Sequence, residues 1–214
     1  MKRMTNIFSK NIDQKLEIAS MTKIMTAYVC CKVLYGDMQC AHLNPKKVYF
    51  RVSSLAARVH GTTAHLKAGL RYSIYDLLIG LMLPSGNDAS LALAENFGRF
   101  LFIENCRTSC NVLKDHLEVD PYDETVSRMY IVKFIRRMNK EAMNLKLCNT
   151  SFSNPHGLSD KANKSSSQDV VRLIFAALKY PLFCEIINKY SFTSNVVYDW
   201  DAQRDQSLQG MLVH

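Results

Sequence analysis

A serine and a lysine three residues apart open an apolar run at residues 18–28. On a helix, positions i and i+3 lie on one face, so the Ser20 hydroxyl and the Lys23 amine can meet. Serine attacks a carbonyl efficiently only when a neighbouring base takes its proton, and lysine can be that base if burial or a nearby cation favours its neutral amine. The spacing therefore indicates a nucleophile beside a base. A helix N-cap followed by a solvated lysine would give the same pattern.

A second polar cluster follows the apolar segment at residues 77–82. Pro84 and Gly86 interrupt the helical pattern, so Ser85 and Asn87 are expected at a turn that enters the next helix. The Ser85 hydroxyl could relay a proton to a leaving amine, and the Asn87 amide could hold a substrate carbonyl or orient the lysine. An ordinary turn uses the same residue types. The two motifs together are far less expected by chance than either one alone.

Three segments together resemble the serine D-alanyl-D-alanine carboxypeptidases, low-molecular-mass penicillin-binding proteins related to the serine β-lactamases. They are the tetrad at residues 20–23, the run LLIGLMLPSGNDASLALAE at 77–95 and the segment FSNPHGLSD at 152–160. The resemblance covers residues 7–98 and 133–180 in matching order. It implies an α+β fold of the serine β-lactamase and penicillin-binding-protein type, mainly the helical lobe with an incomplete antiparallel sheet.

The resemblance also implies an activity, which is acyl-enzyme hydrolysis of a peptide ending in D-Ala-D-Ala, with a β-lactam as the alternative ligand. Ser20 would attack the penultimate carbonyl, Lys23 would be the base, and Ser85 would relay the proton to the leaving D-alanine. Asn87 would hold the substrate. His156 would contact it, although a structural turn histidine bonded to backbone explains that residue equally well. No cofactor is implied.

Two departures from the family pattern are expected. Residues 99–130, with a charged middle interrupted by Pro121, are predicted to be an insertion in a single domain over 1–214. The family's Lys-Thr-Gly or Lys-Ser-Gly motif does not occur, and Lys164-Ser165-Ser166 is no substitute because it is expected to lead into a helix. That motif supplies an oxyanion donor in the family, and such a loss typically costs ~100- to 1,000-fold in turnover. The alternative hypothesis is a catalytically impaired remnant acting as a binding or scaffold protein, with self-association through the incomplete sheet.

The composition describes a globular chain with a basic net charge. Of its 214 residues, 48% are hydrophobic and 21% are charged, which is typical of globular domains. The formal net charge of +8 would suit an acidic partner. The densest basic run, Arg136-Arg137 with Lys133 and Lys140, follows one helical pattern typical of a solvated face. A nucleic-acid-binding function therefore ranks last, and no nucleic-acid partner is expected.

The cysteines and the N-terminal region give little evidence for special sites or targeting. Seven cysteines form an odd set without paired C-x-x-C spacing, so neither a zinc site nor a disulfide framework is predicted. No apolar run approaches the length of a membrane span. The N-terminal residues lack the apolar core of a signal peptide, although members of the family generally act outside the cytoplasm. The compartment is therefore left open.

Apolar periodicity predicts the elements that must position these residues. Helices are expected at 20–36, 74–82, 89–97, 134–145 and 169–180, a strand at 46–52, and strand-like segments at 6–12 and 190–194.

Overall fold

The computed structural model describes residues 8–37, 44–106 and 123–194. Within these ranges the α-helices are α1 (Thr22–Lys32), α2 (Ser54–Ala57), α3 (Ile74–Met82), α4 (Asn87–Cys106), α6 (Glu124–Asn144), α7 (Ser167–Ala177) and α8 (Pro181–Ile187). In the same described ranges, four short strands form two antiparallel pairs: β1 (Leu16–Glu17) with β4 (Lys164–Ser165), and β2 (Tyr49–Arg51) with β3 (Arg71–Ser73). The predicted α+β class, dominated by helices, is confirmed.

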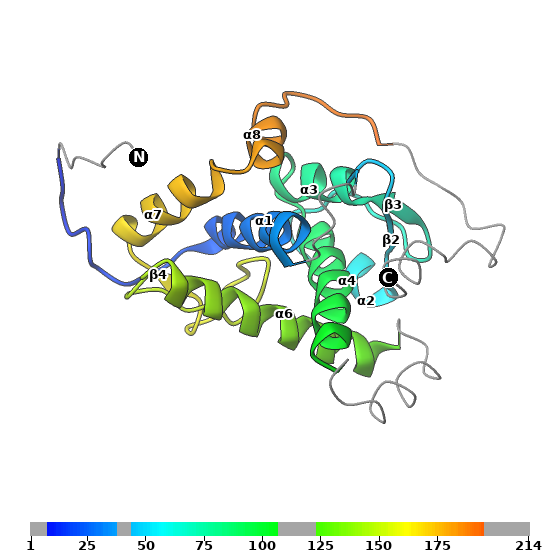
Figure 1. Cartoon of the computed structure of the whole chain (residues 1–214), viewed down its shortest axis with the longest axis horizontal. Coiled ribbons are helices and arrows are strands. Elements are labelled where there is room, and N and C mark those ends of the chain that lie inside the picture. Colours follow the sequence, from blue (N-terminus) through cyan, green and yellow to red (C-terminus); the bar gives the residue numbers. More distant parts are fainter. Residues whose placement is uncertain (1–7, 38–43, 107–122, 195–214) are drawn as a thin grey trace.

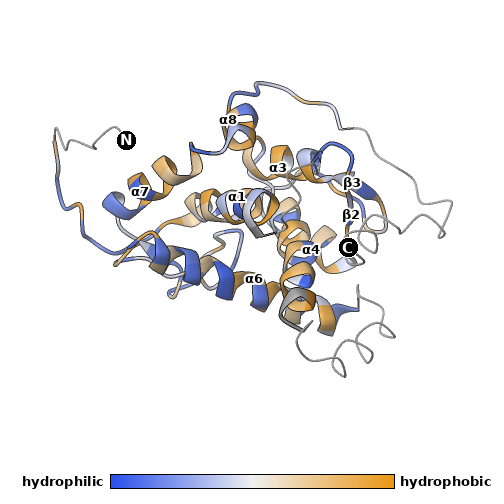
Figure 2. Ribbon diagram, viewed as in Figure 1, coloured by the Kyte–Doolittle hydropathy of each residue, from blue (hydrophilic) through white to orange (hydrophobic). Residues whose placement is uncertain are grey.

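Helix α1 lies in the middle of the molecule and contacts α3, α4, α6, α7 and α8 (Figure 1). Every residue from Thr22 to Cys31 is buried, and hydrophobic residues mark its surroundings in Figure 2. A helix buried on all sides belongs to the centre of a core, so α1 is the central helix of this core. Gly36, predicted to end this helix, instead lies inside a π-helical turn (Val33–Asp37) that follows it.

Helices α3 and α4 follow each other around the Ser85 turn. Helix α3 has the predicted bounds, and the Ser73 hydroxyl at its N-cap accepts a hydrogen bond from Asp76 N at 3.0 Å. Helix α4 continues beyond the predicted residue 97 as far as Cys106. It packs closely on α6, because a Cβ at Gly98 would collide with the Tyr130 carbonyl. The middle of the predicted insertion, residues 107–122, lies outside the described residues.

The last helices differ from their predicted bounds. Helix α7 begins after Ser166, whose hydroxyl caps Asp169 N, but it ends at Ala177 rather than residue 180. Leu178, which keeps the apolar spacing of the helix expected at 169–180, lies just past the end of α7 and is exposed, and Pro181 opens α8. As expected, the Lys164-Ser165-Ser166 stretch leads into a helix. None of the helices in the described ranges combines the length and apolarity needed to cross a membrane.

The prediction of a strand-like segment at residues 190–194 is wrong. These residues form no strand; they cross the start of α3 instead. The Phe192 ring packs edge-on against Tyr75 with centroids 5.9 Å apart, and Ser194 Oγ donates to Asp76 Oδ2 at 2.7 Å. The alternation of aromatic and polar residues therefore reflects docking onto a helix. Residues 8–12 also form no strand, while 6–7 lie outside the described residues.

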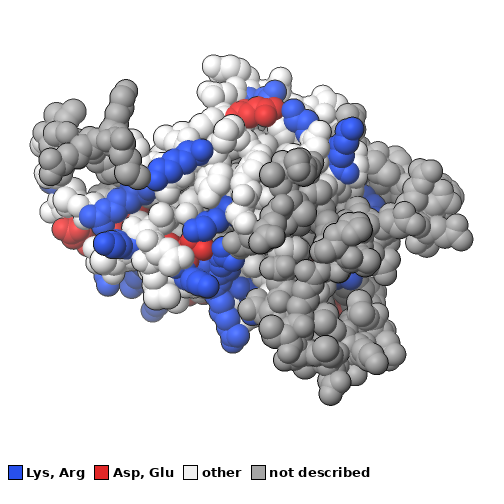
Figure 3. All heavy atoms as spheres, in the orientation of Figure 1, with Lys and Arg blue, Asp and Glu red and all other residues white. Residues whose placement is uncertain are grey.

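Basic side chains are scattered over the face drawn in Figure 3. On α6, Arg136 and Lys140 are exposed, as expected for a solvated helix face. Arg137 differs, because its Nε donates to the buried Glu141 at 2.8 Å, and Lys32 of α1 donates to the same carboxylate at 2.7 Å. Burial would raise the pKa of Glu141, but the hydrogen bonds to these cations outweigh it and lower the pKa. This part of the basic run therefore ties α6 to α1.

Candidate active site

Ser20 lies in a single turn of 3-10 helix (Ala19–Met21) that leads into α1, and its side chain is exposed. Lys23 follows in the first turn of α1 with only 2% of its surface exposed. The expected meeting of the two occurs, since Lys23 Nζ donates to Ser20 Oγ at 3.1 Å. This is within the distance for direct proton transfer. The serine is open to solvent while the amine beside it is buried.

Two further acceptors of Lys23 come from distant parts of the chain. Lys23 Nζ donates to Asn87 Oδ1 at 2.8 Å and to the His156 carbonyl oxygen at 2.7 Å. Amide and backbone carbonyl oxygens can only accept, so each of these contacts uses an N–H bond of the lysine. The start of α1, the start of α4 and the 152–160 loop therefore converge on one nitrogen.

The electrostatics of Lys23 suit a base. Burial lowers the pKa of Lys23 from 10.5 to about 8, because desolvation penalises the ammonium form, and the carboxylate of Asp88 acts in the opposite direction. A lysine with this pKa is partly neutral at neutral pH. The sequence analysis left open whether burial or a nearby cation favours the neutral amine of Lys23, and the structure shows burial.

Backbone contacts hold the turn that carries Ser85. Its φ of +57° lies in the left-handed region that non-glycine residues seldom adopt. Gly86 N donates to the Gly80 carbonyl at 2.9 Å, and Thr62 Oγ1 donates to the Ser85 carbonyl at 2.5 Å. The turn enters α4 as predicted. The Ser85 hydroxyl itself has no hydrogen-bond partner among the residues described, so its proton relay remains a prediction.

Asn87 is 2% exposed, and both ends of its amide have protein partners. Its Oδ1 accepts from Lys23, its Nδ2 donates to the His60 carbonyl at 2.8 Å, and its backbone N–H donates to the Thr62 carbonyl at 2.7 Å. Of the two roles considered for Asn87, orienting the lysine has a direct contact in the structure. Its substrate-binding role remains a prediction.

The 152–160 loop is anchored from below by two hydroxyls. Thr26 Oγ1 of α1 and Ser90 Oγ of α4 each donate to the Pro155 carbonyl at 2.6 Å. The next carbonyl in the chain, that of His156, accepts the Lys23 hydrogen bond described above. Two core helices thus fix the backbone that positions the lysine, which is a contribution of main-chain atoms rather than of the histidine ring.

The His156 ring itself bonds within the loop, where its Nδ1 accepts from the Leu158 backbone N–H at 3.1 Å. Burial first, and then the charges of Lys23 and His60, lower the pKa of His156 to about 4. The imidazole is therefore neutral at neutral pH, with Nε2 carrying the proton. This contact matches the structural turn histidine, and a contact of His156 with substrate remains a prediction.

Gly157 follows and packs directly beneath the nucleophile. It has a φ of +84°, and a Cβ placed on it would collide with the Ala19 carbonyl. Ala19 itself has a φ of +45°. A small hollow of about 80 Å³ opens beside this contact, lined by Glu17, Ala19, Gly157, Leu158, Ser159, Asp160 and Asn163. Glycine is thus required for the close approach of the loop to the Ser20 turn.

Some residues of the site lay outside the sequence interpretation. His60 is exposed, and its backbone carbonyl holds Asn87. Thr62 holds the Ser85 turn through its carbonyl and its hydroxyl. Asp88, directly after Asn87, is buried and bonded to the same loop. An acid at the first turn of a helix was the one available signal for this contact.

No cluster of three or more side chains able to ligate a metal occurs in the ranges that the structure describes. The chemistry open to this arrangement is that of a serine hydroxyl activated by a partly neutral lysine, namely attack on a carbonyl and formation of an ester.

Comparison with known proteins identifies relatives over most of the chain. The model of a family described as D-alanyl-D-alanine carboxypeptidase matches residues 5–104 and 131–214. D-alanyl-D-alanine carboxypeptidase DacF of Bacillus subtilis is 32% identical over 187 residues, covering 87% of this chain and 38% of that protein. The D-alanyl-D-alanine carboxypeptidase of Streptomyces sp. strain K15 is 28% identical over 193 residues, covering 90% of this chain and 57% of that protein.

Solved structures agree with this result. The crystal structure of the Streptomyces K15 DD-transpeptidase superposes with a TM-score of 0.70 at 26% identity, covering 90% of this chain and 63% of that chain. D-alanyl-D-alanine carboxypeptidase DacD from Francisella tularensis gives a TM-score of 0.63 at 26% identity, covering 83% of this chain and 35% of that chain. The fold type expected from the resemblance is confirmed, and the chain spans less than two thirds of the length of each of these relatives.

Proposed function

This chain belongs to the D-alanyl-D-alanine carboxypeptidase family, and from that premise we propose that it is a serine acyl enzyme acting on peptides that end in D-Ala-D-Ala. Ser20 is the nucleophile and Lys23 is its base. The observation that carries the proposal is the 3.1 Å contact between Ser20 Oγ and Lys23 Nζ, beside two fixed acceptors of the same nitrogen.

The arrangement of acceptors dictates where the proton goes. As an ammonium, Lys23 fills all three contacts with its N–H bonds. As a neutral amine it has two N–H bonds and one lone pair. The oxygens of Asn87 and His156 cannot donate, so they retain the two N–H bonds and the lone pair turns to Ser20. The neutral amine is thereby oriented to accept the serine proton.

The proposed reaction then runs in two steps. Ser20 Oγ forms an ester bond with the carbonyl carbon of the penultimate D-alanine, and the bond from that carbon to the nitrogen of the terminal D-alanine breaks. The serine proton passes to Lys23 and from there, with Ser85 as relay, to the leaving amine. Water subsequently hydrolyses the ester and regenerates the hydroxyl. A β-lactam would acylate Ser20 by the same attack on its ring carbonyl.

Asn87 and His156 have separate places in this proposal. Asn87 holds Lys23 through Oδ1, and its binding of the substrate is a separate part of the proposal. Ser20 is exposed and therefore open to a peptide from solvent. His156, neutral at neutral pH, would offer its Nε2–H to that peptide. Self-association of the chain remains a separate prediction.

Release of D-alanine from an N-acylated peptide ending in D-Ala-D-Ala tests the proposal. The wild type should release one D-alanine for each peptide consumed, and Ser20→Ala should release none. An L-Ala-L-Ala peptide is the substrate control. Equal release by the wild type and by Ser20→Ala would contradict the assignment of the nucleophile.

A further inference from the structure

The loop at residues 59–67, between α2 and β3, has no regular secondary structure, yet it supplies three contacts to the site. His60 O accepts from Asn87 Nδ2, Thr62 O accepts from Asn87 N, and Thr62 Oγ1 donates to the Ser85 carbonyl. A loop without a hydrogen-bond ladder needs other anchors if it is to hold a catalytic amide in place.

Asp88 is the anchor for the following residues of this loop. Its side chain is 1% exposed. It accepts from Ala64 N at 2.9 Å, from Leu66 N at 3.0 Å and from Thr63 Oγ1 at 2.7 Å, and also from Ala89 N of its own helix at 2.9 Å. A buried carboxylate with this many donors is satisfied and fixed in position.

We propose that Asp88 is a positioning residue of this site, whose carboxylate ties the 59–67 loop to α4 and thereby fixes Asn87 against Lys23. The inference deepens the proposed function and rests on it. Asp88 makes no contact with Ser20 or with the amine of Lys23 in the structure. It acts through Thr63, Ala64 and Leu66. These residues follow His60 and Thr62, whose carbonyls accept the hydrogen bonds of Asn87.

The charge of Asp88 has a second effect that a purely mechanical anchor would lack. The carboxylate favours the ammonium form of Lys23 and so opposes the effect of burial. Asp88 is the one charged group among the described residues that shifts the pKa of Lys23, and His156, whose pKa of about 4 keeps it neutral, adds no charge beside the amine. Replacing Asp88 by a neutral side chain should therefore lower the pH at which Lys23 loses its proton.

Asp88→Asn separates these effects, with Asp13→Asn, at an exposed carboxylate, as the matched control. At about pH 9.5 the amine is largely neutral in both proteins, so the rate of acylation by penicillin reports positioning alone. The rate of Asp88→Asn should be at least about tenfold below that of the wild type. The Lys23 side-chain signal, followed by NMR, should titrate at lower pH than in the wild type. Asp13→Asn should match the wild type in both measurements.

An unchanged rate at this pH in folded Asp88→Asn, or an unchanged Lys23 titration, overturns the proposal. Thr63→Val removes one partner of Asp88 and keeps the charge, so it should slow acylation without moving the titration. If Asp88→Asn does not fold, a Thr63→Val protein as fast as the wild type overturns the proposal instead.

Amide hydrogen exchange at Ala64 and Leu66 separates a failure of this inference from a failure of the proposed function. Both amides should exchange faster in Asp88→Asn than in the wild type, whether or not penicillin reacts with either protein. Unchanged exchange at both amides contradicts the anchoring role of Asp88. A wild type that penicillin does not acylate contradicts only the proposed function.

Discussion

Asn87 Oδ1 accepts a hydrogen bond from Lys23 Nζ at 2.8 Å, joining the start of α4 to the start of α1. The contact is buried, and the other end of the same amide is bonded to the His60 carbonyl. The hydrogen bond from Nδ2 fixes the Asn87 amide so that its Oδ1 points toward Lys23. This relationship links the two sequence motifs into one site.

Substituting Asn87 should alter the pH dependence of acylation. Asn87→Asp places a carboxylate beside Lys23, which raises the pKa of the amine above its value of about 8. The midpoint of the acylation rate should move to higher pH. Asn87→Ala removes the acceptor without adding charge and should lower the rate by about 100-fold through misplacement of the lysine. Stopped-flow acylation by a chromogenic β-lactam across pH measures both effects. A midpoint that stays in place in Asn87→Asp would argue against the contact.

The wild-type protein should react faster as the pH rises. Because burial lowers the pKa of Lys23 to about 8, the neutral base is scarce below this pH and predominates above it. The acylation rate should therefore increase through about pH 8 and level off beyond it. Lys23→Arg keeps a positive charge but cannot lose its proton in this range, so its acylation rate should not increase with pH. Between about pH 6 and pH 10 this amine should pass through nearly its full titration. An acylation rate that stays constant over this range would exclude Lys23 as the base.

Gly157→Ala should damage both stability and reactivity. The new Cβ would collide with the Ala19 carbonyl, directly before Ser20, at a φ of +84°. Gly69→Ala is a matched control, since Gly69 has a φ of +82° and open space around its Cα. Urea unfolding should show a loss of about 1 kcal/mol for Gly69→Ala from backbone strain, and a larger loss for Gly157→Ala. Only Gly157→Ala should slow acylation. Equal effects of the two substitutions would show that the close contact is unimportant.

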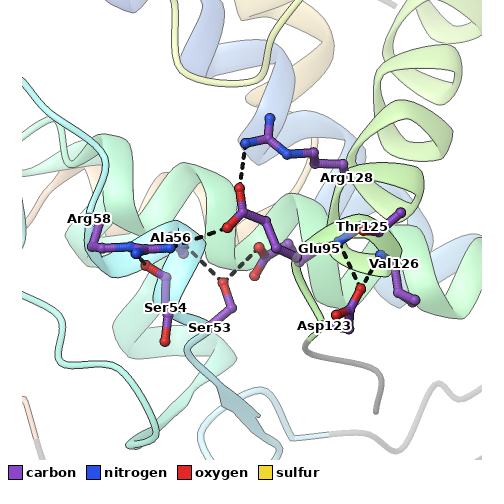
Figure 4. Close-up of polar contacts among 10 residues, drawn as sticks. Ser53, Ser54, Ala56, Arg58, Glu95, Asp123, Thr125, Val126 and Arg128 are labelled. Atoms are coloured by element: carbon purple, nitrogen blue, oxygen red, sulfur yellow. Dashed lines mark hydrogen bonds and ion pairs between the residues drawn. The ribbon is translucent and has the colours of Figure 1, made fainter. Parts of the chain in front are cut away.

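Buried Glu95 should make stability depend on pH. It lies on α4 with 3% exposure, and its Oε1 accepts from Ser53 Oγ at 2.7 Å (Figure 4), while Oε2 has no partner among the described residues. Burial raises the pKa of Glu95 to about 7, and the hydrogen bond from Ser53 acts in the opposite direction. Between pH 4.5 and 7 the folded state holds a proton that the unfolded state has released. Stability is therefore lost as the pH rises through this window.

Glu95→Gln removes this titration. The wild type should lose roughly 3 kcal/mol of unfolding free energy relative to Glu95→Gln between pH 4.5 and pH 8. Denaturant unfolding at a series of pH values measures the difference between the two proteins. Glu17→Gln, at an exposed carboxylate, is the control and should follow the wild type. A constant difference between Glu95→Gln and the wild type would contradict the raised pKa.

Local patterns in the sequence were sufficient to predict the core of the site. The Ser20 and Lys23 pair depends only on helical spacing, and the Ser85 to Asn87 turn depends on the Pro84 and Gly86 breaks, so both could be predicted from neighbouring residues. The sequence also predicted the bounds of α3, because the Ser73 side chain caps its first turn.

The contacts that complete the site could not be predicted in the same way. The carbonyls of His60, Thr62, Pro155 and His156 hold the side chains, and a backbone carbonyl carries no sequence signature. Tertiary contacts also overrode local patterns. Residues 190–194 alternate like a strand but dock on α3, and Leu178 follows the inward spacing but lies past the end of α7. The roles of Ser85, of the predicted insertion and of His156 toward substrate remain predictions.

The most direct test of the central claim is the intact mass of the protein after incubation with a penicillin. The wild type should gain the mass of one penicillin, and Ser20→Ala, shown by circular dichroism to be folded, should gain none. Peptide mapping should place the adduct on Ser20. A folded wild type that gains no mass, or a Ser20→Ala protein that gains the same mass as the wild type, would contradict a nucleophile formed by Ser20 and Lys23.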